Sequence, residues 1–151
     1  MLLDLENHSP VMREAISHCL WARQYESNAE EAVARYTRKG WEVGDLLKDF
    51  ISRYSNMRFI FPGIYLGDEP ELTTDVAVAV GVYPGWVAEA QKRAGVKMWP
   101  VGEAFETCEA VLLGEDGFIY LYGDAGLQRV GSGFPEAMLA LVTDQWDTTF
   151  F

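Results

Sequence analysis

Apolar residues recur at helical spacing through the first third of the chain. Ser9 and Pro10 form a helix-start signal, with serine as the N-cap and proline in the first turn. The apolar positions that follow at this spacing are Val11, Ala15, Ile16, Cys19 and Leu20. The pattern predicts a first amphipathic helix over residues 10–20.

Two more helices are predicted before residue 56. Ser27 and Glu30 are spaced as a capping box, in which the hydroxyl and the carboxylate each accept a backbone N–H, and Gly40 ends this helix. The third helix follows Gly44, and its apolar residues again recur at helical spacing: Leu46, Leu47, Phe50, Ile51 and Tyr54. Each helix therefore has one apolar face that another element must cover.

Beyond residue 56 the apolar pattern changes to that of β-strands. Runs rich in β-branched or aromatic residues predict strands over 57–61 and 74–80, joined by an exposed acidic loop at 67–71. Pro84 then opens a short helix that ends at Gly95. The first two strands and this helix connect the N-terminal helices to the rest of the chain.

Four further strand-length runs, separated by turn residues, predict an antiparallel meander: 97–101, 108–113, 118–122 and 127–130. After residues 131–133 the apolar spacing is helical as far as Trp146, with Pro135 in the first turn. We therefore expect an α+β fold, with N-terminal helices followed by a mostly antiparallel sheet of about 4–6 strands and a closing C-terminal helix. Because no repeat or linker divides the chain, a single domain over residues 1–151 is expected.

The composition supports a packed domain in a reducing compartment. With 49% hydrophobic residues in 151, a core can form without a disulfide or a metal. Cys19 and Cys108 lie in apolar patterns and are expected to be small core residues, although a disulfide between them stays open. The first ten residues lack the basic start of a secretory signal, and no apolar run reaches membrane-spanning length. These features predict a soluble, cytoplasmic protein.

The formal net charge of −11 limits the possible partners. Nucleic acids and anionic membranes attract basic surfaces, so direct binding to either is not expected. If charge takes part in recognition, the partner is basic. The alternative is that the acidic surface only keeps the protein soluble and monomeric.

Catalytic motifs are not found in the sequence. The only histidines are His8 and His18, and the chain has neither the ligand spacing of a zinc site nor a phosphate-binding glycine loop. Gly131-Ser132-Gly133 lacks the spacing of a nucleophile elbow, and a strand-to-helix turn explains it better. An enzyme would need His18, a cysteine and an acid brought together by the fold. We therefore expect no catalytic residues, no metal and no cofactor.

Acidic clusters and exposed aromatic residues are the candidates for binding a protein. Clustered carboxylates speed the encounter with a basic partner, and tyrosine and tryptophan are enriched among interface hot spots. The candidate partner-binding residues are Tyr65, Asp68, Glu69, Glu71, Asp75, Trp86, Glu103 and Glu106. The aromatic residues Tyr83, Trp99, Phe150 and Phe151 also fall at predicted loops or element ends. For the acids, the alternative interpretation is an ordinary solvated surface.

Two stretches resemble the third subgroup of the SUKH superfamily of bacterial immunity proteins. One is Lys39-Gly40-Trp41; the other runs from Trp99-Pro100-Val101-Gly102 through 108–113, 116–120 and Val130-Gly131 to the closing helix. The resemblance implies a cytoplasmic protein that binds and neutralises a cognate toxin, often a nuclease, and that is encoded beside it. It brings no catalytic residues. The alternative is a regulatory protein-binding scaffold; the oligomeric state and small-ligand binding are left open.

Overall fold

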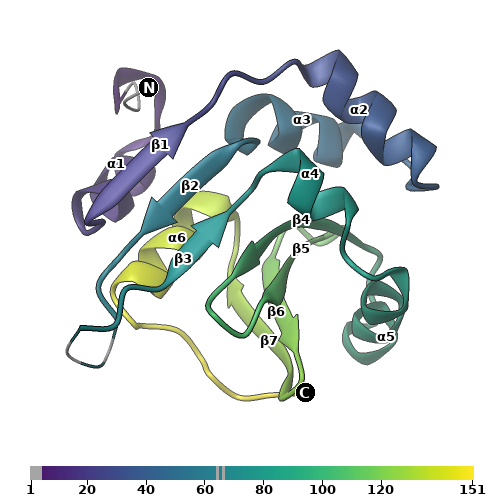
Figure 1. The fold of residues 1–151 in the computed structure, drawn as a ribbon. Helices are drawn as coiled ribbons and strands as arrows, with labels where there is room; N and C mark the ends of the chain where they lie inside the picture. The colour runs from purple at the N-terminus through teal and green to yellow at the C-terminus, as the bar shows by residue number, and fades with distance from the viewer. Residues whose placement is uncertain (1–4, 64, 66) are drawn as a thin grey trace.

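The helices predicted near the N-terminus are present. The structure is a computed structural model that describes residues 5–63, 65 and 67–151. A short 3-10 turn, η1 (Leu5–Asn7), precedes α1 (Pro10–Ser17), α2 (Ala29–Arg38) and α3 (Asp45–Tyr54). Ser9 caps α1 as predicted, since its Oγ accepts the Met12 N–H at 3.2 Å. The first helix ends three residues earlier than predicted, and η1 and α1 together lie at one end of the molecule (Figure 1).

The capping box predicted for the second helix is wrong by one residue. The N-cap is Asn28, whose Oδ1 accepts the Glu31 N–H at 3.1 Å, and Ser27 lies outside the helix. An asparagine side chain caps a helix as well as a serine does, so the two neighbouring signals compete. The apolar face expected for this helix is confirmed, because Ala32 and Tyr36 are buried.

Among the described residues, the sheet has seven strands in sequence order, each antiparallel to the next. This confirms the predicted α+β meander, with more strands than expected. The strands are β1 (Trp21–Gln24), β2 (Met57–Ile60), β3 (Glu71–Thr73), β4 (Met98–Ala104), β5 (Glu109–Gly114), β6 (Ile119–Gly123) and β7 (Gly126–Gly131). The remaining helices are α4 (Val76–Val80), α5 (Pro84–Ala94) and α6 (Phe134–Val142).

The strand predicted over 74–80 is wrong, because this segment forms α4. The strand of this region is β3, which ends where the Thr74 Oγ1 accepts the Met57 N–H at 2.9 Å. Beyond it, Val76, Ala79 and Val80 are buried at i, i+3 and i+4, which is helical spacing. A short run of β-branched residues is compatible with either element, and burial against the core decides between them.

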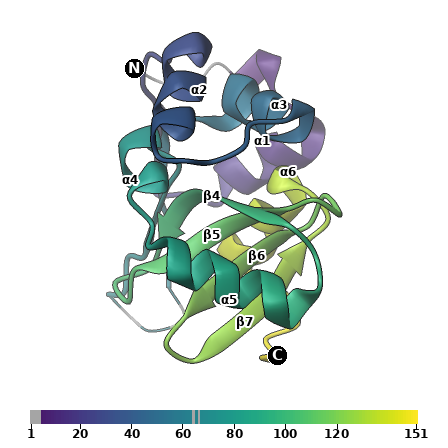
Figure 2. The same ribbon diagram turned by 90° about the vertical axis from the view of Figure 1, so that its right-hand side faces the viewer.

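Helices cover one face of the whole sheet but only half of the other (Figures 1 and 2). The main core joins α1, α3 and α6 to the inner faces of the strands, with Met12, Phe50, Phe59, Leu121 and Met138 among its buried residues. A second, smaller core lies between α5 and the opposite face of β4–β7, around Val87, Ala90, Leu112, Tyr120 and Tyr122. No helix in the described part of the chain covers that opposite face along β1–β3.

The C-terminal segment beyond α6 lies along β7. The closing helix ends at Val142, earlier than the predicted Trp146, and Asp144 adopts a left-handed conformation with φ of 53°. The Gln128 Nε2 donates to the Thr148 carbonyl at 2.7 Å, and the Phe151 N–H donates to the Leu127 carbonyl at 2.9 Å. We call residues 143–151 the tail.

Both cysteines are free, and their positions differ. Cys19 is half-buried against the main core, in partial agreement with the prediction. The prediction for Cys108 is wrong, because this residue lies exposed in the turn between β4 and β5, with φ of 54°. A turn directs the side chain away from the sheet, which an apolar sequence pattern does not reveal. No helix within the described ranges is long and apolar enough to cross a membrane.

Candidate protein-binding surface

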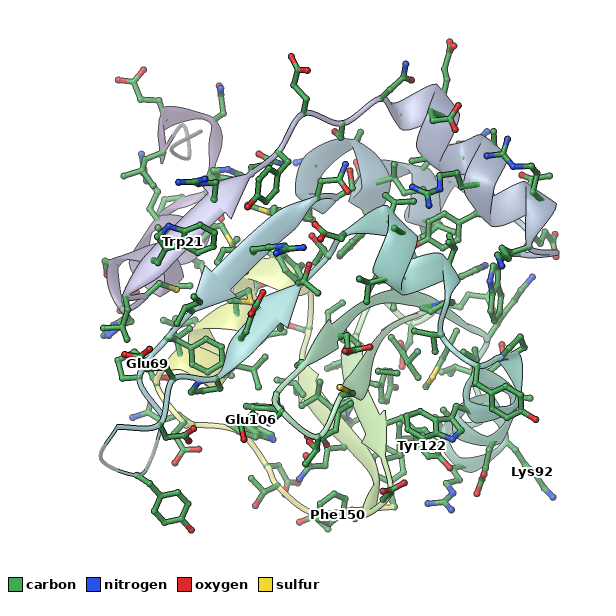
Figure 3. All side chains as sticks on the ribbon, viewed as in Figure 1. Trp21, Glu69, Lys92, Glu106, Tyr122 and Phe150 are labelled. Atoms are coloured by element: carbon green, nitrogen blue, oxygen red, sulfur yellow. The ribbon has the colours of Figure 1, made fainter. Side chains whose placement is uncertain are left out.

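The fold brings two of the predicted acidic clusters together. The Phe105 N–H donates to the Glu71 carbonyl at 2.8 Å, and the Phe105 ring packs edge-on against Phe61, with 6.2 Å between ring centroids. The turn between β4 and β5, which we call the hairpin (residues 105–108), therefore lies beside the loop that leads into β3. We call the carboxylates gathered here the acidic end: Asp68, Glu69, Glu71, Glu103 and Glu106. Figure 3 shows Glu69 and Glu106 on the neighbouring connections.

The acidic end is built from segments that contain no lysine or arginine. Basic residues are absent from the sequence between Arg58 and Lys92, and again between Lys97 and Arg129. The carboxylates of the loop and of the hairpin thus lie together, and neither segment supplies a lysine or arginine to neutralise them. Such a local excess of one sign of charge produces a potential that attracts basic partners.

The other candidate residues have different surroundings. Tyr65 belongs to the acidic loop, where its carbonyl accepts the Asp68 N–H at 3.0 Å, and its side chain is 73% exposed. Asp75 is held in an ion pair with Arg58 at 2.7 Å. Trp86 lies on α5, far from the acidic loop in Figure 1, and packs edge-on against Tyr122 at 5.7 Å between centroids. Six of the eight predicted residues therefore gather at one end, and Asp75 and Trp86 lie apart from it.

A second surface, which the sequence analysis missed, lies on the uncovered side of β1–β3. We call it the open face, and it consists of Trp21, Arg23, Tyr25, Arg58 and Ile60. The strand register places these side chains together, because Trp21 pairs with Ile60 and Arg23 pairs with Arg58. The signal was present in the sequence Trp21-Ala22-Arg23-Gln24-Tyr25, where large side chains alternate with smaller or amide residues at strand spacing.

Contacts among its side chains hold the open face in place. The Arg23 guanidinium lies 5.0 Å from the centroid of the Trp21 ring, and that of Arg58 lies 5.6 Å from the Tyr25 ring. Arg58 is also paired with Asp75. Side chains fixed by such contacts lose less conformational entropy when a partner binds. Tryptophan, tyrosine and arginine are also the residue types most enriched among interface hot spots.

The open face and the acidic end are continuous. Ile60 pairs with Glu71 across β2 and β3, so Glu71 lies in the same row as Trp21 and Ile60. Glu103 pairs with Thr73 and so lies on the same side of the sheet as Arg58. Together they form an apolar and cationic centre with an acidic border.

A cavity of about 380 Å³ opens between the hairpin and the tail. We call it the hairpin–tail pocket. Three aromatic residues line it, which are Phe105 from the hairpin and Trp146 and Phe150 from the tail. Its other side chains are Thr107, Glu109, Asp124, Ala125 and Gln128. The pocket thus combines aromatic walls with two carboxylates.

Glu109 is a half-buried carboxyl group in this pocket. Its Oε2 accepts a hydrogen bond of 3.1 Å from the Thr107 hydroxyl, which lowers its pKa, but partial burial has the larger effect and raises the pKa above the ordinary value. Gly123 makes room for this side chain, since a Cβ added there would lie 2.7 Å from the Glu109 Cγ. The chain therefore holds a half-buried carboxyl group against aromatic rings.

The residues considered for catalysis do not share one site. His18 is exposed at the C-cap of α1, and burial raises the pKa of the neighbouring Cys19 thiol to about 11, which keeps it protonated at neutral pH. Cys108 lies in the hairpin. Across the described residues, no group of three or more histidine, cysteine or acidic side chains is arranged to hold a metal ion. Comparison of the chain with models of protein families, with curated proteins and with solved structures found no match.

Proposed function

We propose that this protein is a cytoplasmic immunity protein of the SUKH type, which binds and neutralises a cognate bacterial toxin. It acts by occupying a surface of the toxin and not by catalysing a reaction. The resemblance in the sequence supplies the class of partner, and a nuclease is the toxin class that best fits an acidic protein, because nucleases are basic where they hold nucleic acid.

The observation that carries the proposal is the open face with its acidic border. An aromatic and arginine-rich patch that no helix in the described part of the chain covers has the composition of an interface centre. The carboxylates of the acidic end form a polar rim on one side of it. Hot spots surrounded by a charged rim give both tight contact and orientation.

Co-expression with the toxin domain encoded beside the gene tests the proposal. We expect the wild-type protein to restore growth and to co-purify with the toxin domain at one-to-one stoichiometry. Continued killing in the presence of folded protein would contradict neutralisation. Binding without rescue would favour the regulatory scaffold.

Two pairs of variants locate the interface in the same assay. Tyr25→Ala removes an aromatic side chain of the open face that is 40% exposed, and the matched control Tyr83→Ala removes one that is 66% exposed beside α5. Trp21→Ala is compared with Trp86→Ala in the same way. If the open face is the centre, the first member of each pair weakens binding by about tenfold or more and the second does not.

A further inference from the structure

The hairpin–tail pocket has the composition of a site for an organic cation. Its aromatic rings come from the hairpin and the tail, and the faces of aromatic rings attract positive charge through their quadrupoles. A volume of about 380 Å³ lies within the range of pockets that enclose a small ligand or a side chain. The volume and the wall chemistry therefore favour a group of side-chain size with an apolar stem.

Charge distinguishes a cation from a neutral or anionic occupant. The pocket contains the carboxylates of Glu109 and Asp124, and no lysine or arginine is among its lining residues. Arg93, whose Nη1 would lie 3.3 Å from a Cβ added at Gly126, lies beside the turn between β6 and β7 and is already paired with Glu89 at 2.7 Å. An anion would meet two like charges at short range, and a neutral ligand would leave both carboxylates without a counter-charge.

Glu109 gives the clearest reason for a cationic occupant. Its carboxyl group is half-buried, and the only hydrogen-bond donor that the described structure gives it is the Thr107 hydroxyl. Partial burial raises its pKa, because removal from water disfavours the charged form. A guanidinium group would supply both the missing charge and parallel N–H donors.

We infer that the hairpin–tail pocket receives an arginine side chain of the bound protein. The guanidinium stacks on the aromatic walls and pairs with Glu109, and the methylene stem lies along Phe105 and Phe150. Arginine fits better than lysine, because its planar group stacks on rings and meets a carboxylate with two donors. This inference rests on the proposed function only in that a protein partner supplies the side chain.

The pocket is tested without the partner by titrating the protein with N-acetyl-arginine methylamide. The indole N–H resonance of Trp146, assigned by its loss in Trp146→Phe, reports on the pocket in a proton–nitrogen correlation spectrum. We expect a saturable shift of this resonance, with N-acetyl-norleucine methylamide giving none. No saturable shift at Trp146, or equal shifts with both probes, would overturn the inference.

Matched pairs of variants test whether the probe binds in this pocket. Phe150→Ala and Phe151→Ala remove adjacent tail rings with 47% and 46% exposure, but only Phe150 lines the pocket, whereas Phe151 packs on Tyr120. We expect Phe150→Ala to weaken the probe about threefold and Phe151→Ala to leave its affinity unchanged. Glu109→Gln weakens it about fivefold, and Glu14→Gln, on the exposed side of α1, makes the same charge change without effect. Equal effects within either pair would contradict the assignment.

The two proposals fail separately. In one outcome, Glu109→Gln and the wild type neutralise the toxin equally well and the pocket binds no probe. This result would contradict the arginine pocket and would leave the proposed immunity function in place. In the opposite outcome, the probe binds at Trp146 but the protein neither binds nor neutralises the neighbouring toxin. This result would support the arginine pocket and would contradict the proposed function.

Discussion

Arg58 donates two hydrogen bonds to one carboxylate oxygen, with Nε and Nη2 at 3.0 and 2.7 Å from the Asp75 Oδ2. The pair links β2 to the residue that precedes α4, and the same guanidinium lies over the Tyr25 ring. Asp75 is therefore a structural partner within the open face, whereas the sequence analysis grouped it with the exposed acids.

A double-mutant cycle measures the coupling energy between Arg58 and Asp75. With Arg58→Met, Asp75→Asn and their combination, we expect a coupling of about 1 kcal/mol in the free energy of urea unfolding, because Asp75 is largely buried, with a side chain 17% exposed. The control is the Arg53–Asp49 pair on α3, where both side chains are more than half exposed. The coupling of this exposed pair is expected to be smaller and to disappear in high salt. Equal couplings would show that burial does not strengthen the first pair.

Two tryptophans differ in whether the indole N–H has a partner. Trp99 Nε1 donates to the Glu42 carbonyl at 2.7 Å, whereas the enclosed Trp146 Nε1 has no hydrogen-bond partner among the described residues. Trp99→Phe therefore removes a hydrogen bond, and Trp146→Phe removes an unsatisfied donor. We expect Trp99→Phe to be the more destabilising by about 1–3 kcal/mol in chemical denaturation. Equal losses would mean that the Trp146 N–H finds a partner in solution.

The N-terminal helices and the C-terminal meander were predictable because their signals are local. Apolar spacing and turn residues such as Gly117, which has φ of 87°, mark these elements in the sequence itself. The elements that failed depend on tertiary context. β1 is a four-residue edge strand with half-buried side chains, and α4 is a five-residue apolar run that packs against β4.

The candidate site was predictable only in part, for a related reason. Composition identified the acids, but which of them gather depends on the Phe105–Glu71 contact between segments far apart in the sequence. Glu109 is not among the candidate residues, because its pocket needs the tail to lie along β7, as the Gln128 to Thr148 hydrogen bond shows. Arg58 was missed because a basic residue was not expected in the binding surface of an acidic protein.

The pH dependence of stability gives a test of Glu109. Because the folded-state pKa of this carboxyl group is raised, the folded protein binds the proton more tightly than the unfolded chain does. Its contribution is therefore fully present below the ordinary pKa and is lost as the pH rises through the folded value. We expect Glu109→Gln to become more stable relative to wild type as the pH increases from 4 to 7.

The hydroxyl group that contacts Glu109 provides a control for this measurement. The Thr107 hydroxyl favours the ionised form of Glu109 and so opposes the effect of burial. Thr107→Val should therefore steepen the decline in stability with pH in the same window. A Glu109→Gln difference that stays constant from pH 4 to 7 would contradict a perturbed carboxyl group.

The acidic end should act on the rate of association more than on the lifetime of the complex. Replacing Asp68, Glu69 and Glu71 by lysine changes the local charge by six units at the border of the open face, and leaves Trp21, Tyr25 and Arg58 in place. With the toxin domain as ligand in stopped-flow or surface binding at low salt, we expect association to slow roughly tenfold and its salt dependence to flatten. Reversal of Glu26, Glu30 and Glu31 at the start of α2 makes the same change in net charge away from this border. If both triple variants slow association equally, net charge steers the encounter; if only the first does, the acidic end faces the toxin.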